Sequence, residues 1–264
     1  MVFFISVLFC ALAYINFYYA QRIEAQMQYE EMKPVEALKV RDVQEVLPEA
    51  GSEGAAMEEI RQAEDSLIPR RENMVDFETL GGINEDIYAW IQIPGTMVDY
   101  PVLQHPSDDA YYLNHTAEHT AGLPGSIYSE SVHPKDFSAV NTVLYGHNMK
   151  NGTMFGSLHE YEEQEFFDEN PYIYIFCPNR TFVYEIFAAS KFSDAYLPDY
   201  CDYEQEDGFD AYIRAIKEGA YCWNDEVEVP FGSRVLTLST CVAGEGESRF
   251  LVTAVLADEY EKEP

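Results

Sequence analysis

Eight short segments rich in β-branched, aromatic and aliphatic residues constrain the fold of this 264-residue chain more than any other feature. Such residues favour strands, and the turn-forming residues between the segments favour short connections. The predicted strands are Tyr88–Ile93, Val98–Gln104, Gly125–Ser129, Thr142–Tyr145, Tyr172–Phe176, Thr181–Lys191, Val235–Thr240 and Phe250–Ala257. Eight short strands separated by turns predict a mainly β fold in which the strands form a closed or nearly closed barrel.

Two helices are expected to accompany these strands. A short one should lie just after Arg71, before the first strand. The other is expected within Tyr203–Tyr221, between the sixth and seventh predicted strands, where Phe209, Tyr212 and Ile216 recur at helical spacing. This spacing is typical of an amphipathic helix that packs on the barrel.

The charge balance excludes one class of partner. The chain has 47 Asp and Glu against 16 Lys and Arg, which gives a formal net charge of −31. Proteins that bind nucleic acids need clustered basic residues to contact phosphates. We therefore expect no nucleic-acid partner.

The N-terminal segment Val2–Ala20 contains no charged residue. Its length is just sufficient to cross a bilayer, so residues 1–20 are predicted to be a single-pass membrane anchor, with the rest of the chain outside the cytoplasm. A cleaved signal peptide is the alternative, because Ala11–Ala13 resembles a cleavage site. No Lys or Arg precedes the segment, whereas Arg22 follows it, which does not favour this orientation. We therefore expect the natural start to lie upstream of Met1.

Residues 21–70 are interpreted as an acidic spacer. This stretch has twice as many acidic as basic residues, several Gly and Pro, and no sustained apolar periodicity. Such a composition does not indicate a packed core. The folded domain is therefore predicted to comprise residues 71–264.

Five cysteines occur, at positions 10, 177, 201, 222 and 241. No Cys-x-x-Cys or Cys/His metal spacing is present, so no metal site is expected. Cys201 and Cys222 flank the predicted helix, and a disulfide between them would require both flanking loops to fold back. We expect free thiols. Cys241 differs from the others because it ends a predicted strand immediately before a Gly-rich turn.

His147 occupies a similar position, because it follows the predicted strand 142–145 and its terminal Gly146. The other five histidines are His105, His115, His119, His133 and His159. Three of these adjoin Pro or charged residues and are expected at the surface; they are His105, His133 and His159. His115 and His119 are four residues apart, but nothing supplies a third metal ligand.

Cys241, His147 and Arg249 together form a complete set for acyl transfer. A thiol becomes a useful nucleophile beside a base or cation, and imidazole titrates in the appropriate range. A guanidinium keeps its charge and can donate hydrogen bonds to a carbonyl oxygen or oxyanion. The alternative is a buried structural cysteine and an arginine that neutralises Glu245 and Glu247.

Three segments of the sequence resemble the signature segments of sortases, the cysteine transpeptidases of Gram-positive cell surfaces. They are "NTVLYGHNMKNGTMFGSL", "LTLSTC" and the arginine of "SRFLV". The segments "AWIQIPGTMVDYPVLQ" and "YYLNH", and the helix before the last two strands, are similar to class B in particular. The resemblance covers residues 71–260.

The resemblance implies an eight-stranded sortase-type β-barrel with an N-terminal helix, a membrane anchor, and neither metal nor cofactor. It implies that Cys241 is the nucleophile, His147 the acid/base, and Arg249 the ligand of the oxyanion or substrate carbonyl. Asn114 and Ser239 match positions that line the substrate groove in relatives.

The implied substrates are a C-terminal sorting signal of the NPxTx type and an amine. Cleavage after Thr would leave a thioester on Cys241, which a peptidoglycan-precursor or pilin amine would resolve. Two alternatives remain open at this point. A secreted cysteine hydrolase would use the same residues with water as the acceptor, and a membrane-anchored binding domain would need no reactive thiol.

Overall fold

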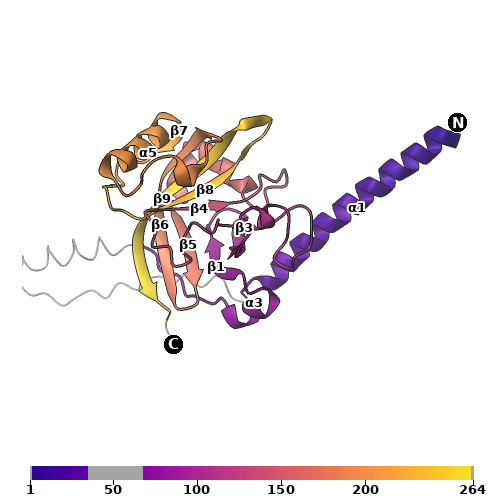
Figure 1. Cartoon of the computed structure of the whole chain (residues 1–264), viewed down its shortest axis with the longest axis horizontal. Coiled ribbons are helices and arrows are strands. Elements are labelled where there is room, and N and C mark those ends of the chain that lie inside the picture. The colour runs from indigo at the N-terminus through magenta and orange to yellow at the C-terminus, as the bar shows by residue number, and fades with distance from the viewer. Residues whose placement is uncertain (1, 35–67, 263–264) are drawn as a thin grey trace, which may run out of the picture.

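The computed structural model describes residues 2–34 and 68–262. Within them one sheet contains nine strands (Figure 1). The strands are β1 Ile87–Gln92, β2 Asp99–Leu103, β3 Ile127–Tyr128, β4 Asn141–Tyr145, β5 Tyr172–Cys177, β6 Arg180–Ser193, β7 Ala220–Trp223, β8 Val235–Val242 and β9 Glu245–Glu261.

Eight of these strands close into a barrel. Their order is β5-β1-β2-β3-β4-β8-β9-β6, and pairing of β5 with β6 completes the ring. The pairs β2–β3 and β4–β8 are parallel, and the other pairs are antiparallel. Strand β7 pairs with β6 outside the ring. The predicted eight-stranded barrel is therefore confirmed, and β7 is an additional strand that the sequence pattern did not indicate.

Helices and short 3₁₀ helices precede the barrel strands or connect them. They are α1 Val2–Met32, α3 Phe77–Ile83, η1 Tyr111–Leu113, η2 Gly156–Glu162, α4 Gln164–Glu169, η3 Leu197–Asp199 and α5 Glu206–Glu218. Helix α3 begins at a side-chain cap, because the Asp76 carboxylate accepts hydrogen bonds from the backbone N–H groups of Glu78 and Thr79. It is the short helix expected after Arg71.

Two apolar clusters hold the fold together. The larger includes side chains from all eight barrel strands. The smaller lies between the barrel and α5, and it contains the Phe209, Tyr212 and Ile216 stripe together with Val235 of β8. In Figure 1, α5 lies beside β7 against one side of the barrel. The predicted amphipathic helix is therefore present between β6 and β8, and at Glu206–Glu218 it is three residues shorter than the expected range at each end.

Alternation along β8 separates these two clusters. Leu236 and Leu238 belong to the larger cluster, whereas Val235 belongs to the smaller. Between them, Thr237 accepts a hydrogen bond from the Tyr212 hydroxyl of α5 and donates one to the Asn141 side chain of β4. Successive side chains of a strand point to opposite faces. The odd-numbered residues of β8 therefore face the side of the sheet on which α5 packs.

Helix α1 is continuous from Val2 to Met32, so it includes the first residues of the expected spacer. Its last turns pack on the domain, where Ala25, Tyr29 and Met32 are buried, while its N-terminal part extends away from the barrel (Figure 1). Within the described ranges, no helix has the length and apolar character needed to cross a membrane. The anchor expected at 1–20 is thus not confirmed, and residues 35–67 of the expected spacer lie outside the described residues.

Tyr29 attaches α1 to the loop before β3. Its hydroxyl donates to the Gly125 carbonyl at 2.6 Å and lies 3.0 Å from the Ser126 hydroxyl. It also accepts a hydrogen bond from the Ala117 backbone N–H at 3.3 Å. The ring meets Tyr100 of β2 edge to face, with 5.4 Å between centroids. These contacts make the end of α1 part of the folded domain.

His133 is buried, which corrects the expectation of a surface histidine. Its side chain is only 5% exposed, and its Nε2 accepts a hydrogen bond from the Val143 backbone N–H of β4 at 3.4 Å. Burial lowers the pKa of His133 from 6.5 to about 4. The folded domain therefore holds this ring neutral at pH values where the unfolded chain would protonate it.

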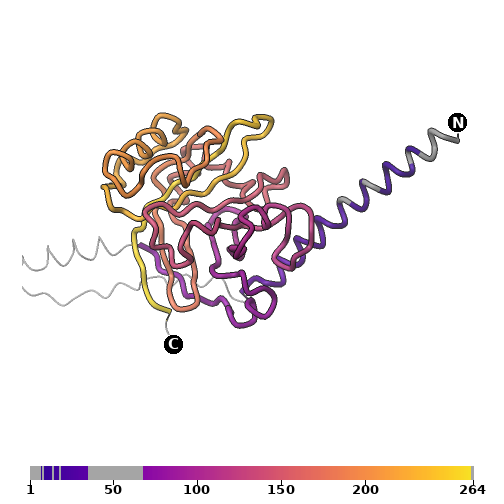
Figure 2. The backbone as a smooth tube through the Cα atoms, viewed as in Figure 1, coloured from indigo at the N-terminus to yellow at the C-terminus, as the bar shows by residue number. Residues whose placement is uncertain are grey.

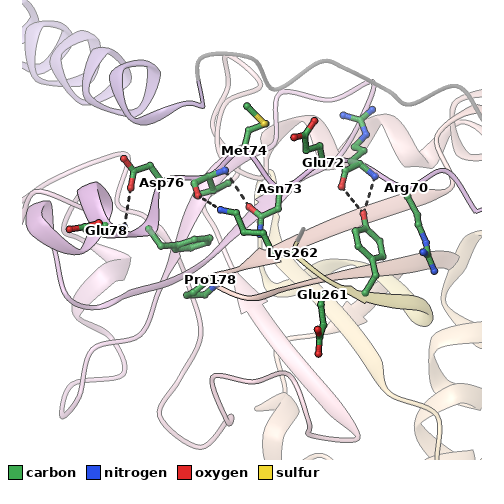
Figure 3. A pocket seen from close by; sticks show the side chains of 13 residues that line it. Arg70, Glu72, Asn73, Met74, Asp76, Glu78, Pro178, Glu261 and Lys262 are labelled. Carbon is green, nitrogen blue, oxygen red and sulfur yellow. Dashed lines mark hydrogen bonds between the residues drawn. The ribbon is translucent and has the colours of Figure 1, made fainter. Parts of the chain in front are cut away.

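A pocket lies at the C-terminal end of β9, the end opposite to Arg249 (Figure 3). Segment 70–78 and the end of β9 line it. The Tyr260 hydroxyl accepts from the Arg71 backbone N–H at 2.9 Å and donates to the Arg71 carbonyl at 2.8 Å. The Lys262 ammonium donates to the Val75 carbonyl. These contacts fasten the segment before α3 to the C-terminal strand.

Replacing Tyr29 by Phe should destabilise the domain by about 1–3 kcal/mol, because the Ala117 N–H and the Gly125 carbonyl lose their buried partner. Urea unfolding of the full chain measures this loss. Ile23→Ala, at an α1 side chain that is 61% exposed, is the control and should change stability by less than about 0.5 kcal/mol. Equal stabilities of Tyr29→Phe and the unmodified chain would contradict the assigned role of Tyr29.

Acid should weaken the fold through His133. Because its folded pKa is depressed, stability is lost as the pH falls from 6.5 to about 4. The lost amount is up to about 3 kcal/mol. In His133→Gln the decrease between pH 7.5 and pH 4.5 should be smaller than in the unmodified chain, as measured by urea unfolding at both values. His105→Gln, which removes a half-exposed histidine, should keep the full decrease; identical decreases in all three chains would refute this origin.

Candidate active site

The pairing of β4 with β8 brings His147 and Cys241 to the same end of the barrel. The two strands are parallel, with Tyr145 opposite Ser239. His147 and Cys241 each lie two residues beyond this pair. The Gly146 N–H donates to the Ser239 carbonyl, and the Thr240 hydroxyl donates to the Gly146 carbonyl. These bonds continue the contact between the two strands up to His147.

Gly146 is needed where the chain leaves β4. A Cβ atom at this position would lie 2.5 Å from the Ile127 side chain and 2.7 Å from the Phe155 ring. A larger residue here would force the Ile127 and Phe155 side chains to move, so glycine suits this close approach. The segment then folds back on itself, and the Phe155 N–H donates to the His147 carbonyl at 3.1 Å. His147 is therefore held on both sides by backbone contacts.

Arg249 lies directly opposite Cys241 in the β8–β9 pair. Its guanidinium donates from Nη1 to the carbonyls of Gly246 and Ser248, at 3.2 and 3.1 Å. Glu245 pairs instead with Lys191 of β6. Arg249 is thus directed by backbone carbonyls of its own turn, and within the described residues its guanidinium forms no ion pair with Glu245 or Glu247, the two carboxylates of the alternative interpretation. Figure 2 shows the β8–β9 turn at the end of the barrel away from the C-terminus.

The imidazole of His147 is oriented by η1. Its Nε2 lies 2.7 Å from the Leu113 carbonyl oxygen. Because a carbonyl oxygen can only accept a hydrogen bond, this contact assigns a proton to Nε2. Nδ1 is then the ring nitrogen that is left to exchange a proton with a reacting group.

Cys241 differs from the other domain cysteines in exposure. All five cysteines are in the described residues, and all have free thiols, as expected. Burial raises the pKa of Cys177 to about 12, and it also raises the pKa values of Cys201 and Cys222. A raised pKa disfavours the nucleophilic thiolate. Cys241 is the exposed thiol of the barrel; it is paired with Arg249 across β8 and β9 and lies at the same strand end as His147.

The two expected groove residues have different surroundings. Asn114 is exposed at the end of η1, directly after the Leu113 carbonyl that contacts His147. Ser239 is 4% exposed on β8, two residues before Cys241 and on the same face of the strand. Asn114 is therefore accessible beside the candidate site, whereas Ser239 lies beneath it.

Two residues that sequence reasoning missed contact Cys241. The Asn148 side chain donates to the Cys241 carbonyl at 2.8 Å, and His159 Nε2 lies 3.1 Å from the same oxygen. His159, which we expected at the surface, is 23% exposed and also contacts the backbone of Cys241. Its spacing of three residues from Glu162 places these two side chains on one face of a helix and so indicates the His159–Glu162 pair, but it gives no signal for the contact with Cys241.

Histidines 115 and 119 surround an aromatic ring. The His115 ring stacks on Tyr111 with centroids 3.9 Å apart, and His119 Nδ1 lies 3.2 Å from the Tyr111 hydroxyl. No group of three or more His, Cys, Asp or Glu side chains suited to a metal ion occurs among the residues that the structure describes.

The sortase domain model matches residues 91–257, which include both strand ends and Arg249. The chain belongs to the sortase family. It is 30% identical to sortase B of Staphylococcus aureus over 207 residues, 77% of this chain and 83% of that protein. It is also 30% identical to sortase B of Listeria monocytogenes over 166 residues, 63% of this chain and 67% of that protein.

Structural similarity agrees with the sequence comparison. A solved S. aureus sortase B–substrate complex superposes with a TM-score of 0.62 at 31% identity, covering 68% of this chain and 83% of that one. The class B relationship expected from the sequence is confirmed, and this sortase is a class B-type cysteine transpeptidase.

Proposed function

We propose that this sortase cleaves a C-terminal sorting signal of the NPxTx type at its threonine and transfers the acyl group to an amine. The observation that carries this proposal is the register of β8 with its two neighbouring strands. Arg249 of β9 lies opposite Cys241, and His147 follows the end of β4 at the same level as Cys241. A solved complex of the S. aureus sortase B with its substrate supports this proposal. Sortases are cell-surface enzymes, so we place the reaction outside the cytoplasm.

In the first half-reaction, the Cys241 thiol gives its proton to Nδ1 of His147, and its sulfur attacks the carbonyl carbon of the threonine. Arg249 donates hydrogen bonds to the oxygen on which negative charge develops. The C–N bond to the next residue breaks, and His147 gives a proton to the departing amine. A thioester between the threonine and Cys241 remains.

In the second half-reaction, an acceptor amine attacks the thioester carbon. His147 accepts a proton from this amine, a new amide bond forms, and the C–S bond breaks. The leaving sulfur takes the proton from His147, which restores the Cys241 thiol. We propose a peptidoglycan precursor or a pilin lysine as the source of the amine. Asn114 is exposed beside the Leu113–His147 contact, and we propose that it contacts the bound peptide.

Cys241→Ala should abolish both peptide cleavage and thioester formation, because no other exposed thiol lies at this site. Mass spectrometry of the protein with a panel of sorting peptides, each with and without added amines, measures both. We expect a peptide–amine product that increases with amine concentration. Cys201→Ala, at a half-buried thiol, should retain activity; product formation by Cys241→Ala, or hydrolysis unaffected by every amine, would contradict the proposal.

Arg249→Lys keeps the charge but loses the planar fork of donors. If Arg249 directs hydrogen bonds to the carbonyl, turnover should fall about 100-fold. The rate of amide formation with a cleaved sorting peptide measures the effect. Arg234→Lys is the matched control at the other end of β8, where the arginine pairs with Glu259, and it should be nearly neutral. Full turnover of Arg249→Lys, with an unchanged circular dichroism spectrum, would exclude the directed role.

A further inference from the structure

A second histidine binds the backbone of the residue that carries the candidate nucleophile. His159, from η2, has its Nε2 3.1 Å from the Cys241 carbonyl oxygen. The Asn148 amide nitrogen lies 2.8 Å from the same oxygen and 2.9 Å from His159 Nε2. Two side chains therefore meet at one carbonyl, and one of them, Asn148, directly follows His147 in the chain.

Glu162 orients the His159 ring. Its carboxylate oxygen lies 2.6 Å from His159 Nδ1. Because a carboxylate accepts, Nδ1 carries a proton. Nε2 then either accepts from Asn148 or, when the ring is charged, donates to the Cys241 carbonyl. In the first case the ring holds Asn148, whose other N–H donates to the Cys241 carbonyl; in the second case the ring and Asn148 both donate to that carbonyl.

The same ring also contacts β9. His159 stacks on Phe250, with centroids 4.5 Å apart and an interplanar angle of 24°. Phe250 directly follows Arg249. One imidazole thus touches the backbone of Cys241 and the side chain next to Arg249.

The contact between His159 and Cys241 lies near the end of β8, where the strand is least fixed by its neighbours. The β8–β9 register shifts between Cys241 and Val242, and the turn that follows is largely exposed. The regular ladder is interrupted there, so contacts from another segment can fix the end of β8. Displacement of a reacting group by about 1 Å can cost 100-fold in rate.

We propose that His159, held by Glu162, is a positioning residue that fixes the Cys241 backbone and so aligns the thiol with His147 and Arg249. The proposal rests on the nucleophilic role proposed above for Cys241. It connects η2 with the site, because His159 contacts both the Cys241 carbonyl and Asn148, the residue after His147.

Two substitutions of His159 separate positioning from bulk structure. Glutamine places an amide nitrogen near the site of Nε2, so His159→Gln can still donate to the Cys241 carbonyl. Asparagine reaches only the site of Nδ1, so His159→Asn cannot. We expect kcat for a sorting peptide to fall roughly 10- to 100-fold in His159→Asn with KM unchanged, and to stay within about threefold in His159→Gln.

Glu162→Gln and Glu160→Gln form a matched pair on the same short helix. Both remove one negative charge, but Glu160 is exposed and makes no side-chain contact with His159. We expect kcat to fall roughly 3- to 10-fold in Glu162→Gln, because Nδ1 loses its carboxylate partner, and to be unchanged in Glu160→Gln. Equal effects of the two substitutions would indicate a general charge effect and would overturn the proposal.

Amide hydrogen exchange across residues 241–249 provides a readout without substrate. Exchange should be up to about tenfold faster in His159→Asn than in His159→Gln, because one hydrogen bond to the strand end is lost. Unchanged kcat and exchange in His159→Asn, or equal losses in both variants, would refute the positioning role. Failure of the proposed function looks different: the unmodified enzyme would then leave every peptide intact, while the exchange difference between the two variants would persist.

Discussion

Strands β4 and β8 run parallel and in register, and the arrangement of the candidate site depends on this pairing. Parallel strands end at the same edge of a sheet, so two residues distant in sequence emerge together. Here they are His147 and Cys241, two residues beyond the pair Tyr145–Ser239. The antiparallel return of β9 then sets Arg249 opposite Cys241. A shift of one residue in β8 would turn its side chains to the opposite face and would separate these groups.

Buried polar contacts protect this register. The side chains of Asn141, Thr237 and Tyr212 connect β4, β8 and α5 through two hydrogen bonds of 2.8 and 2.6 Å. A slip of β8 would leave these groups unpaired inside the protein, at a cost of about 1–3 kcal/mol for each. Apolar contacts alone discriminate less sharply between registers, because neighbouring aliphatic residues can replace one another. The polar contacts therefore add specificity to the packing of α5 on the barrel.

Most of the barrel could be predicted from sequence, because its strands are short apolar runs separated by turn residues. Strand β7 could not, since Ala220–Trp223 is only four residues long and only Cys222 in it is buried. The site was partly predictable for a similar reason. His147, Cys241 and Arg249 each lie at the end or the beginning of a recognisable strand, whereas the contact of His159 with Cys241 joins residues 82 positions apart. The pattern of neighbouring residues carries no signal for such a tertiary contact.

The prediction of a spacer over 21–70 failed to anticipate Tyr29 for a related reason. A single tyrosine does not produce an apolar periodicity in the sequence, yet Tyr29 joins α1 to the domain through its hydrogen bond to the loop before β3. Since α1 is helical without interruption from Val2 to Met32, no joint separates its attached end from its far end. The part of the helix before Ala25, residues 2–24, extends roughly 35 Å at 1.5 Å per residue. Because the helix is continuous and its last turns are packed on the domain, the orientation of its outer end is linked to the orientation of the barrel, and so to the direction in which the barrel end with Cys241 faces.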